Sequence, residues 1–238
     1  MVLFLRLGLL LLTSFRSVES AKAPKSQSLN LGDATLLVLD GMEDEGMKLA
    51  KELLAKESTK VNLEVEADDG SKGTPLAVAI HTMASPKAED ALGLIKLLVA
   101  HKDIDVNAAL TSPVGSTMPP LLLAANAVTA GVGAGLEIAN LLLAHESIKV
   151  NAATTGTSTL APLHMALAAA ARGSEAGVEL VKALLARSDI DVSVKMKGPD
   201  GVEMTPLEKL AAMLLDKPGD ANIIKLQGML EGSKKDEL

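Results

Sequence analysis

Apolar and polar positions follow one pattern in four segments of the chain, and each segment ends in a valine. The valines are Val61, Val106, Val150 and Val192, spaced 42 to 45 residues apart. The leucines eight positions before them are Leu53, Leu98, Leu142 and Leu184, and a further apolar residue stands twelve positions before each valine. Residues four positions apart share one face of an α-helix. We therefore predict a helix ahead of each valine, with this face buried.

A second anchor, a Pro-Leu pair, follows each valine. The prolines are Pro75, Pro120, Pro162 and Pro206. Proline in the first turn of a helix loses no hydrogen bond and pre-sets φ, so each pair marks a helix start. The alanines six positions before the valines, where we expect only a methyl group to fit between stacked helices, are Ala55, Ala100, Ala144 and Ala186. Each unit is thus predicted to be a helix, a turn, a longer helix and a polar loop.

Together these motifs resemble the ankyrin repeat over about residues 30 to 232. Thr74 to Ala79 reads T-P-L-A-V-A and Ala161 to Ala166 reads A-P-L-H-M-A, and both combine with segments of the form L-L-x-A-H-x-x-I-x-V-N. The period exceeds the roughly 33 residues of ankyrin and overlaps the HEAT and armadillo range, but those families do not predict Pro-Leu helix starts combined with an I-x-V-N turn. The resemblance implies an all-α fold, an ankyrin-like helical repeat solenoid of about five helix pairs with long finger loops. It also implies that His164 hydrogen-bonds a loop backbone.

Part of the extra repeat length lies in four hairpin-like loops, called fingers 1 to 4 below. They span residues 62–73, 107–118, 151–160 and 193–204. Loops on one side of a stacked array are the usual place for binding determinants, so we expect partners to bind there. The candidate partner-binding residues are Asp68, Asp69, Lys72, Ser112, Met118, Thr155, Thr157, Met196, Lys197, Asp200 and Glu203. Among the finger methionines, we expect Met118, Met196 and Met204 to be exposed.

The repeat domain is predicted to span residues 29–232. An N-terminal cap covers residues 29–60, and the repeats cover about 61–105, 106–149, 150–191 and 192–232. Residues 1–20 are typical of a secretory signal peptide with cleavage between Ser20 and Ala21, and residues 21–28 form a polar linker. A transmembrane anchor is the alternative for residues 1–20, but Arg6 and Arg16 leave fewer apolar residues than the roughly 20 that a span requires.

Residues 233–238 are expected to form an exposed tail that carries a retrieval signal. The signal residues are Lys235, Asp236, Glu237 and Leu238. This KDEL tetrapeptide is recognised by the receptor that returns lumenal proteins to the endoplasmic reticulum, and an ordinary solvated charged tail is the alternative. Together with the signal peptide it predicts a location in the endoplasmic reticulum lumen, with no membrane span after signal removal.

Composition and charge argue against several classes of function. The 238 residues include no Cys, which excludes disulfide staples and thiol chemistry. The net charge of -7 argues against nucleic-acid binding, which needs a basic face. The four histidines are scattered, and no Ser-His-Asp set, zinc motif or phosphate loop is recognisable. We therefore expect no enzyme activity, no cofactor and no metal site.

These observations predict a non-enzymatic protein-protein interaction scaffold or adaptor, which binds an unidentified lumenal protein through its fingers and inner helices. The chain has no Trp or Tyr and only two Phe, Phe4 and Phe15, so the interface is expected to use aliphatic, Met and charged contacts. Weak lumenal calcium binding or buffering is the alternative, because acidic oxygens suit calcium. The acidic residues of the N-terminal segment are Asp40, Glu43, Asp44, Glu45, Glu64, Glu66, Asp68 and Asp69.

Overall fold

The structure, a computed structural model, describes residues 29–83, 91–155, 159–197 and 201–233. Ten α-helices form most of this part of the chain. They are α2 (Leu31–Leu39), α3 (Glu43–Leu54), α4 (Pro75–Thr82), α5 (Ala91–Val99), α6 (Pro120–Thr129), α7 (Gly135–Leu143), α8 (Pro162–Ala171), α9 (Glu175–Leu185), α10 (Pro206–Asp216) and α11 (Ala221–Ser233). The all-α prediction needs one correction, because six two-residue strands form as well. No described helix combines the length and the apolar character that crossing a bilayer requires.

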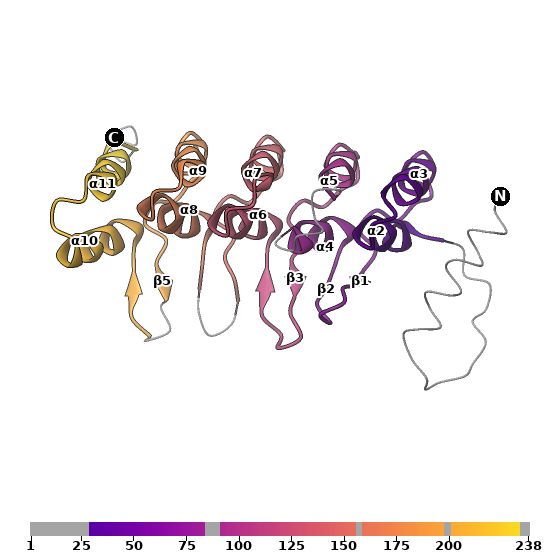
Figure 1. The fold of residues 1–238 in the computed structure, drawn as a ribbon, viewed down its shortest axis with the longest axis horizontal. Coiled ribbons are helices and arrows are strands. Elements are labelled where there is room, and N and C mark those ends of the chain that lie inside the picture. Colours follow the sequence, from indigo (N-terminus) through magenta and orange to yellow (C-terminus); the bar gives the residue numbers. More distant parts are fainter. Residues whose placement is uncertain (1–28, 84–90, 156–158, 198–200, 234–238) are drawn as a thin grey trace.

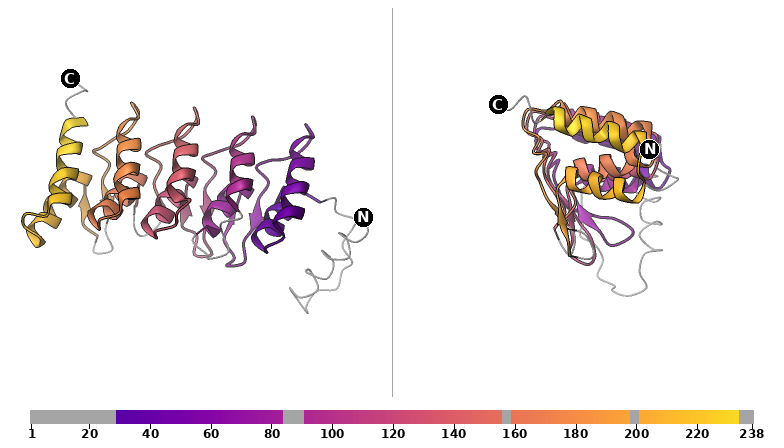
Figure 2. Two further views of the ribbon diagram at one scale, coloured as in Figure 1. Left: turned by 45° about the horizontal axis from the view of Figure 1, so that its top comes forward. Right: turned by 90° about the vertical axis from the view of Figure 1, so that its left-hand side faces the viewer.

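The helices follow one another in pairs that stand in a single row (Figure 1). The inner helices α2, α4, α6, α8 and α10 form one layer, and the outer helices α3, α5, α7, α9 and α11 form a second layer over it (Figure 2). Each pair contacts the next one along the row, as α4 contacts α6 and α7 contacts α9. The fold is therefore held together by contacts between pairs that are neighbours in sequence, and its shape is elongated.

Four inner helices begin where the Pro-Leu pairs predict. Helices α4, α6, α8 and α10 begin at Pro75, Pro120, Pro162 and Pro206. Before α4, Oγ1 of Thr74 accepts a hydrogen bond from the N–H of Ala77 at 3.3 Å. Before α10, the N–H of Thr205 donates to the carboxylate of Glu208 at 2.8 Å, which completes a capping box. First-turn N–H groups have no partner inside the helix, so these contacts stabilise the starts of α4 and α10, whereas α6 and α8 begin at proline without a side-chain cap.

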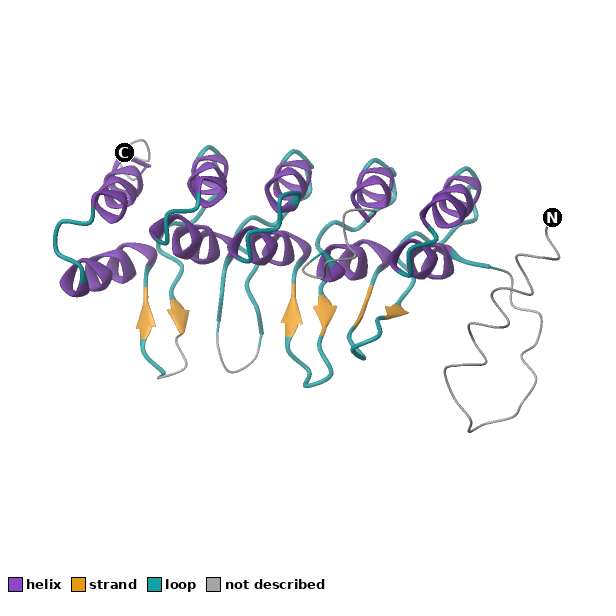
Figure 3. Cartoon of the chain, in the orientation of Figure 1, coloured by secondary structure: helices purple, strands orange, loops and turns teal. Residues whose placement is uncertain are grey.

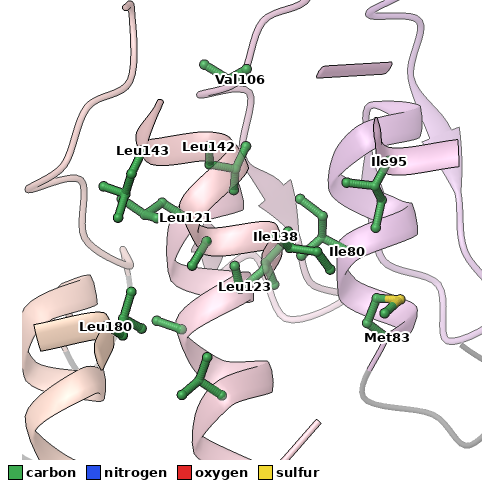
Figure 4. Packing of buried hydrophobic residues seen from close by; sticks show 14 of the residues in the cluster. Ile80, Met83, Ile95, Val106, Leu121, Leu123, Ile138, Leu142, Leu143 and Leu180 are labelled. Atoms are coloured by element: carbon green, nitrogen blue, oxygen red, sulfur yellow. The ribbon is translucent and has the colours of Figure 1, made fainter. Parts of the chain in front are cut away.

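The core is one cluster of aliphatic side chains that runs along the row (Figure 4). The valines and the leucines eight positions before them are at most 8% exposed. Of the residues twelve positions before the valines, Leu94, Ile138 and Leu180 are fully buried and Leu49 is partly buried, so the predicted buried face is confirmed except at Leu49. Leu98, Leu142 and Leu184 are fully buried. Without aromatic rings, leucine, isoleucine, valine and alanine fill the space between neighbouring pairs, which keeps those pairs close enough for dense packing.

The predicted place of closest helix packing is wrong. The four alanines six positions before the valines are exposed, because each directly follows the end of an outer helix. Close approach occurs instead in the first turns of outer helices, at Gly46, Gly135 and Gly177. A Cβ atom on Gly177 would lie 2.5 Å from the backbone N of Ala170. The outer helix therefore touches the backbone of the inner helix at its beginning and not at its end.

The fingers project from one side of the row and are joined to one another (Figure 3). The strands are β1 (Val65–Glu66), β2 (Lys72–Gly73), β3 (Leu110–Thr111), β4 (Thr117–Met118), β5 (Met196–Lys197) and β6 (Glu203–Met204). Fingers 1 and 2 share an antiparallel sheet of order β1-β2-β3-β4, and finger 4 forms the β5-β6 hairpin. Isolated bridges, Thr117 to Thr155 and Thr159 to Lys197, join finger 3 to both neighbours.

Candidate functional site: the finger row

The finger row is a set of eight residues that lie in register across the four fingers. They are Glu66, Lys72, Thr111, Thr117, Thr155, Thr159, Lys197 and Glu203. Glu66 pairs with Lys72 inside finger 1, and Lys72 pairs in turn with Thr111 of finger 2. Further pairs continue the row through Thr117, Thr155 and Thr159 to Lys197 and Glu203 of finger 4. Residues 156–158 of finger 3 lie outside the described part. Strand pairing thus brings together side chains from four repeats.

Side chains of the finger row lie on the solvent side of the hairpins. All eight residues are exposed or half-exposed, whereas neighbouring strand residues such as Val65 and Leu110 are at most 6% exposed. This contrast follows from the alternation of side chains along a strand. The row is charged at both ends and carries four hydroxyl groups at its centre. Because the inner strands pair on both sides, a ligand there meets side chains rather than free backbone groups.

Contacts within the row brace the fingers. Oγ1 of Thr117 and Oγ1 of Thr155 are hydrogen-bonded at 2.8 Å, and the N–H of Thr155 donates to the carbonyl of Thr117 at 3.3 Å. Nζ of Lys72 lies 3.6 Å from Oε2 of Glu66, with both side chains more than half exposed. Exposed ion pairs add little stability. The hydroxyl bridge between fingers 2 and 3 is therefore the stronger brace.

The candidate residues named from the sequence fall into four groups. The members of the finger row are Lys72, Thr155, Lys197 and Glu203. The turn residues are Asp68 and Asp69, both exposed, and Ser112, half-exposed. The methionines Met118, Met196 and Met204 are half-exposed, like Ser112, and Met118 packs against the core, so they are less exposed than predicted. The candidates outside the described residues are Ser20, Ala21, Thr157, Asp200, Lys235, Asp236, Glu237 and Leu238.

Half of the finger row is missing from the sequence-based candidates. The missing members are Glu66, Thr111, Thr117 and Thr159. A signal for them is present, because the second-strand residue of each finger stands three positions before a helix-starting proline, as Thr117 stands before Pro120. The first-strand residue of each finger stands five positions after the repeat valine, as Thr111 stands after Val106. Which fingers pair, and which of these side chains share a surface, becomes visible only in the structure.

A polar contact ties the turn of finger 1 to helix α4. Nε2 of His81 lies 2.9 Å from Oδ2 of Asp69, and the N–H of Ser71 donates to Oδ1 of Asp69 at 2.9 Å. The hydrogen bond with His81 is the main cause that lowers the pKa of Asp69 below its usual value. The carboxylate of Asp69 thus joins the imidazole of His81 on α4 to the main chain of Ser71 in finger 1. The cluster therefore positions finger 1.

The acidic residues of the N-terminal segment do not converge on a cation site. Within residues 29–83, 91–155, 159–197 and 201–233, no group of three or more His, Asp or Glu side chains is placed to hold a metal ion. Glu66 lies beside Lys72, and Asp69 lies beside His81. Only the acidic composition of the N-terminal segment therefore supports the alternative of weak calcium binding.

His164 stands in the first turn of α8 and is only 6% exposed. The ring lies beside the backbone of Met204 and of Val194 in finger 4, where the family resemblance places a loop-backbone hydrogen bond, but neither ring nitrogen reaches full hydrogen-bond geometry with a described residue. Burial lowers the pKa of His164 below its usual 6.5, and the nearby backbone of Met204 and of Val194 opposes this shift in part. The buried ring is therefore neutral in the folded protein at neutral pH.

Acidification is expected to destabilise the protein through His164. Folding lowers the pKa of the ring, so the unfolded chain binds the proton more readily than the folded chain. The contribution of His164 to the free energy of unfolding is therefore complete above about pH 6.5 and decreases below that pH. The melting temperature should fall between about pH 7.5 and about pH 5.5. The melting temperature of His164→Gln should fall less over this pH interval. The matched control, His145→Gln, should show the same fall in melting temperature as the unmodified chain. An unchanged pH dependence in His164→Gln would contradict this role.

No family model matches the chain, and no curated protein sequence matches it. The likeness to ankyrin repeats therefore depends on the repeated residues. The structure shows coarser features: inner helices that begin at the Pro-Leu anchors, and hairpins gathered on one side of the row of helix pairs.

Proposed function

We propose that the chain is an ankyrin-like repeat solenoid that acts as a non-enzymatic protein-binding scaffold in the endoplasmic reticulum lumen. One observation carries the proposed binding role: the finger row gathers exposed side chains from all four fingers into one braced surface. Because this surface follows the row of repeats, a partner that lies along it contacts several repeats at once.

The finger row has the properties of a preorganised binding surface. Strand pairing and the bridge between Thr117 and Thr155 already restrict the fingers, so little conformational entropy is lost when a partner binds. The inner helices add His81, Asn126 and Ala168 at equivalent, partly exposed positions. The mature surface lacks the aromatic side chains that usually dominate binding energy. We therefore expect moderate affinity, distributed over many polar and aliphatic contacts.

The proposed location depends on the signal peptide and the KDEL tail named above. If both are used, the retrieval receptor is a second partner, bound by the tail and not by the fingers. The two kinds of binding then concern separate parts of the chain. A substitution in the finger row is accordingly expected to change partner binding while leaving retrieval intact.

Affinity capture tests the finger row with matched variants. Thr111→Glu combined with Lys197→Glu places new negative charge in the row, and Asn140→Glu combined with Lys182→Glu makes the same charge change on exposed positions of α7 and α9. The row variant should recover about tenfold less partner than the unmodified chain. The added negative charges and the loss of the Thr111 and Lys197 side chains weaken the interface. The outer-helix variant should recover the same amount.

The capture is carried out on separated lumenal and cytosolic fractions, so that it also tests the location. The proposal expects the partner from the lumenal fraction. Equal recovery with the row variant and the unmodified chain would contradict binding through the fingers. Recovery confined to the cytosolic fraction would contradict the location while leaving the binding surface in place.

A further inference from the structure

Each internal helix pair has one strand residue before it and one after it, and these two residues are paired. The first stands two positions before the N-cap of the inner helix, and the second stands five positions after the repeat valine. The pairs are Lys72 with Thr111 around α4 and α5, Thr117 with Thr155 around α6 and α7, and Thr159 with Lys197 around α8 and α9. Strand pairing thus keeps one register at every internal helix pair.

The first helix pair, α2 and α3, has only one of these two residues within the described chain. Glu66 stands five positions after Val61. The residue two positions before Asn30, the N-cap of α2, is Ser28, which lies outside the described residues. Among the described strands, β1 pairs with β2 alone. The register of the other helix pairs therefore assigns Ser28 to the place opposite Glu66.

The beginning of α2 lies where this pairing requires it. Leu29 holds the place that Met118 and Leu160 hold before α6 and α8, and it is half-buried as they are. A Cβ atom on Gly32 would lie 2.8 Å from Cγ2 of Val65, so the first turn of α2 lies directly beside β1. The chain that leads into α2 therefore arrives next to the outer edge of finger 1.

The backbone of β1 directs hydrogen-bonding groups toward this edge. The N–H of Ala67 donates to the carbonyl of Ser71 at 2.8 Å, inside finger 1. Successive residues of a strand direct their backbone groups to opposite sides, so those of Glu66 point outward. At the equivalent place in finger 3, the N–H of Thr155 donates to the carbonyl of Thr117 at 3.3 Å. Glu66 is therefore oriented to make the same bond with a strand on its outer side.

The charges of the two segments are complementary. Residues 21–28 contain two lysines and no acidic residue. The exposed residues along β1 and its flanks are acidic, namely Glu64, Glu66 and Asp68. Opposite charges on neighbouring strands stabilise their pairing. Because residues 21–28 are covalently attached beside this edge, their effective concentration there is high.

We propose that the outer edge of β1 is a binding site for residues 21–28 of the same chain, which add an antiparallel strand with Ser28 opposite Glu66. Main-chain hydrogen bonds supply the affinity in such strand addition. The added strand extends the finger row by one hydroxyl group. It also covers an edge that would otherwise be a template for pairing with other chains. This inference is independent of partner binding by the fingers.

Hydrogen exchange of the Glu66 backbone N–H tests the proposal, measured by NMR on the whole chain, with or without residues 1–20. Ser28→Pro removes an N–H that points toward β1 in the proposed pairing. Gln27→Pro is the matched control, because its N–H would point to solvent, where an edge strand tolerates proline. We expect exchange at Glu66 to be at least about tenfold faster in Ser28→Pro than in the unmodified chain, and within about twofold of it in Gln27→Pro.

Two references make the result specific to residues 21–28. The N–H of Thr155, which is bonded inside the array, should exchange at the same rate in all three chains. Measurements at about 20 and about 200 µM distinguish the chain's own segment from a second copy, because protection by a second copy rises with concentration. The proposal is overturned if Glu66 exchanges at the same rate in the two proline variants, or if its protection increases with concentration.

Discussion

Replacing Gly177 with alanine is expected to lower the free energy of unfolding by about 3 kcal/mol. Gly177 lies in the first turn of α9, where the outer helix meets the end of α8. A Cβ atom there would lie 2.5 Å from the backbone N of Ala170 and 2.8 Å from Cβ of Ala169. Backbone atoms have no rotamer with which to move away, so the two helices must separate, and the core contacts between them loosen.

Gly228→Ala provides the matched control for Gly177→Ala. Gly228 lies inside α11, and nothing stands within 4 Å of the position that its Cβ would take. Alanine there should raise the free energy of unfolding by about 0.5 to 1 kcal/mol, because it has the higher helix propensity. Urea denaturation followed by circular dichroism measures both changes. Equal stability of Gly177→Ala and the unmodified chain would show that α8 and α9 are not held this closely.

The requirement for glycine is set pair by pair. Gly46 and Gly135 hold the same place in the α2-α3 and α6-α7 pairs and have similarly close neighbours. In the α4-α5 pair this place is taken by Ala91, which is 1% exposed, and in the last pair by Ile223, which is fully buried. A buried side chain is therefore accommodated at this place in the α4-α5 and α10-α11 pairs.

Replacing Asn107 with alanine is expected to lower the free energy of unfolding by about 2 kcal/mol. Its side chain joins two successive repeats, because Nδ2 donates to the carbonyl of Ser147 at 2.8 Å and Oδ1 accepts from the N–H of Lys149 at 2.8 Å. Both the donor and the acceptor of the amide are used, so alanine loses both bonds. In an array held by neighbour contacts, losing one such link weakens the coupling between repeats.

The same amide link occurs at two other places in the array. Asn62 bonds Asp103 and Asp105 of the next repeat, and Asn151 bonds Asp189 and Asp191. At the fourth position Ser193 bonds Asp191 of its own turn instead. Three asparagines thus form a ladder between turns, each reaching from one repeat to the next.

Asn126→Ala is the control for Asn107→Ala, because Asn126 is exposed on α6. It should change the free energy of unfolding by no more than about 0.5 kcal/mol. The denaturation midpoint of each variant measures the difference. If Asn107→Ala is as stable as Asn126→Ala, water replaces the lost bonds fully, and the ladder adds nothing to the coupling between repeats.

Several features of the fold were predictable because they depend on short stretches of sequence. The helix starts at Pro75, Pro120, Pro162 and Pro206 follow from the fixed φ of proline and from its missing N–H. The burial of Leu98 and Leu142 follows from the period of the helix. The polar hairpins between these elements follow from the spacing of the same anchors.

Other features depend on what lies beside a residue in space. Ala100 and Ala144 have the small size of packing residues, but each follows directly after the end of its helix and faces solvent. Met118 lies in a polar finger, yet strand alternation turns it toward the core, against which it packs. His164 matches a motif in which histidine bonds a backbone, and its ring lies beside the backbone of Met204 and of Val194 without reaching full hydrogen-bond geometry.

By itself, the sequence determined the helical repeat, its anchors and the side of each helix that is buried, because these depend on periodicity and on local backbone chemistry. The tertiary structure decided which finger residues share a surface. A strand register relates residues about 40 positions apart, such as Thr117 and Thr155, and a change of one residue in register would turn every side chain to the opposite face. Contacts between neighbouring repeats set that register, namely the ladder of asparagines and the packing of one helix pair on the next. No single repeat contains these contacts.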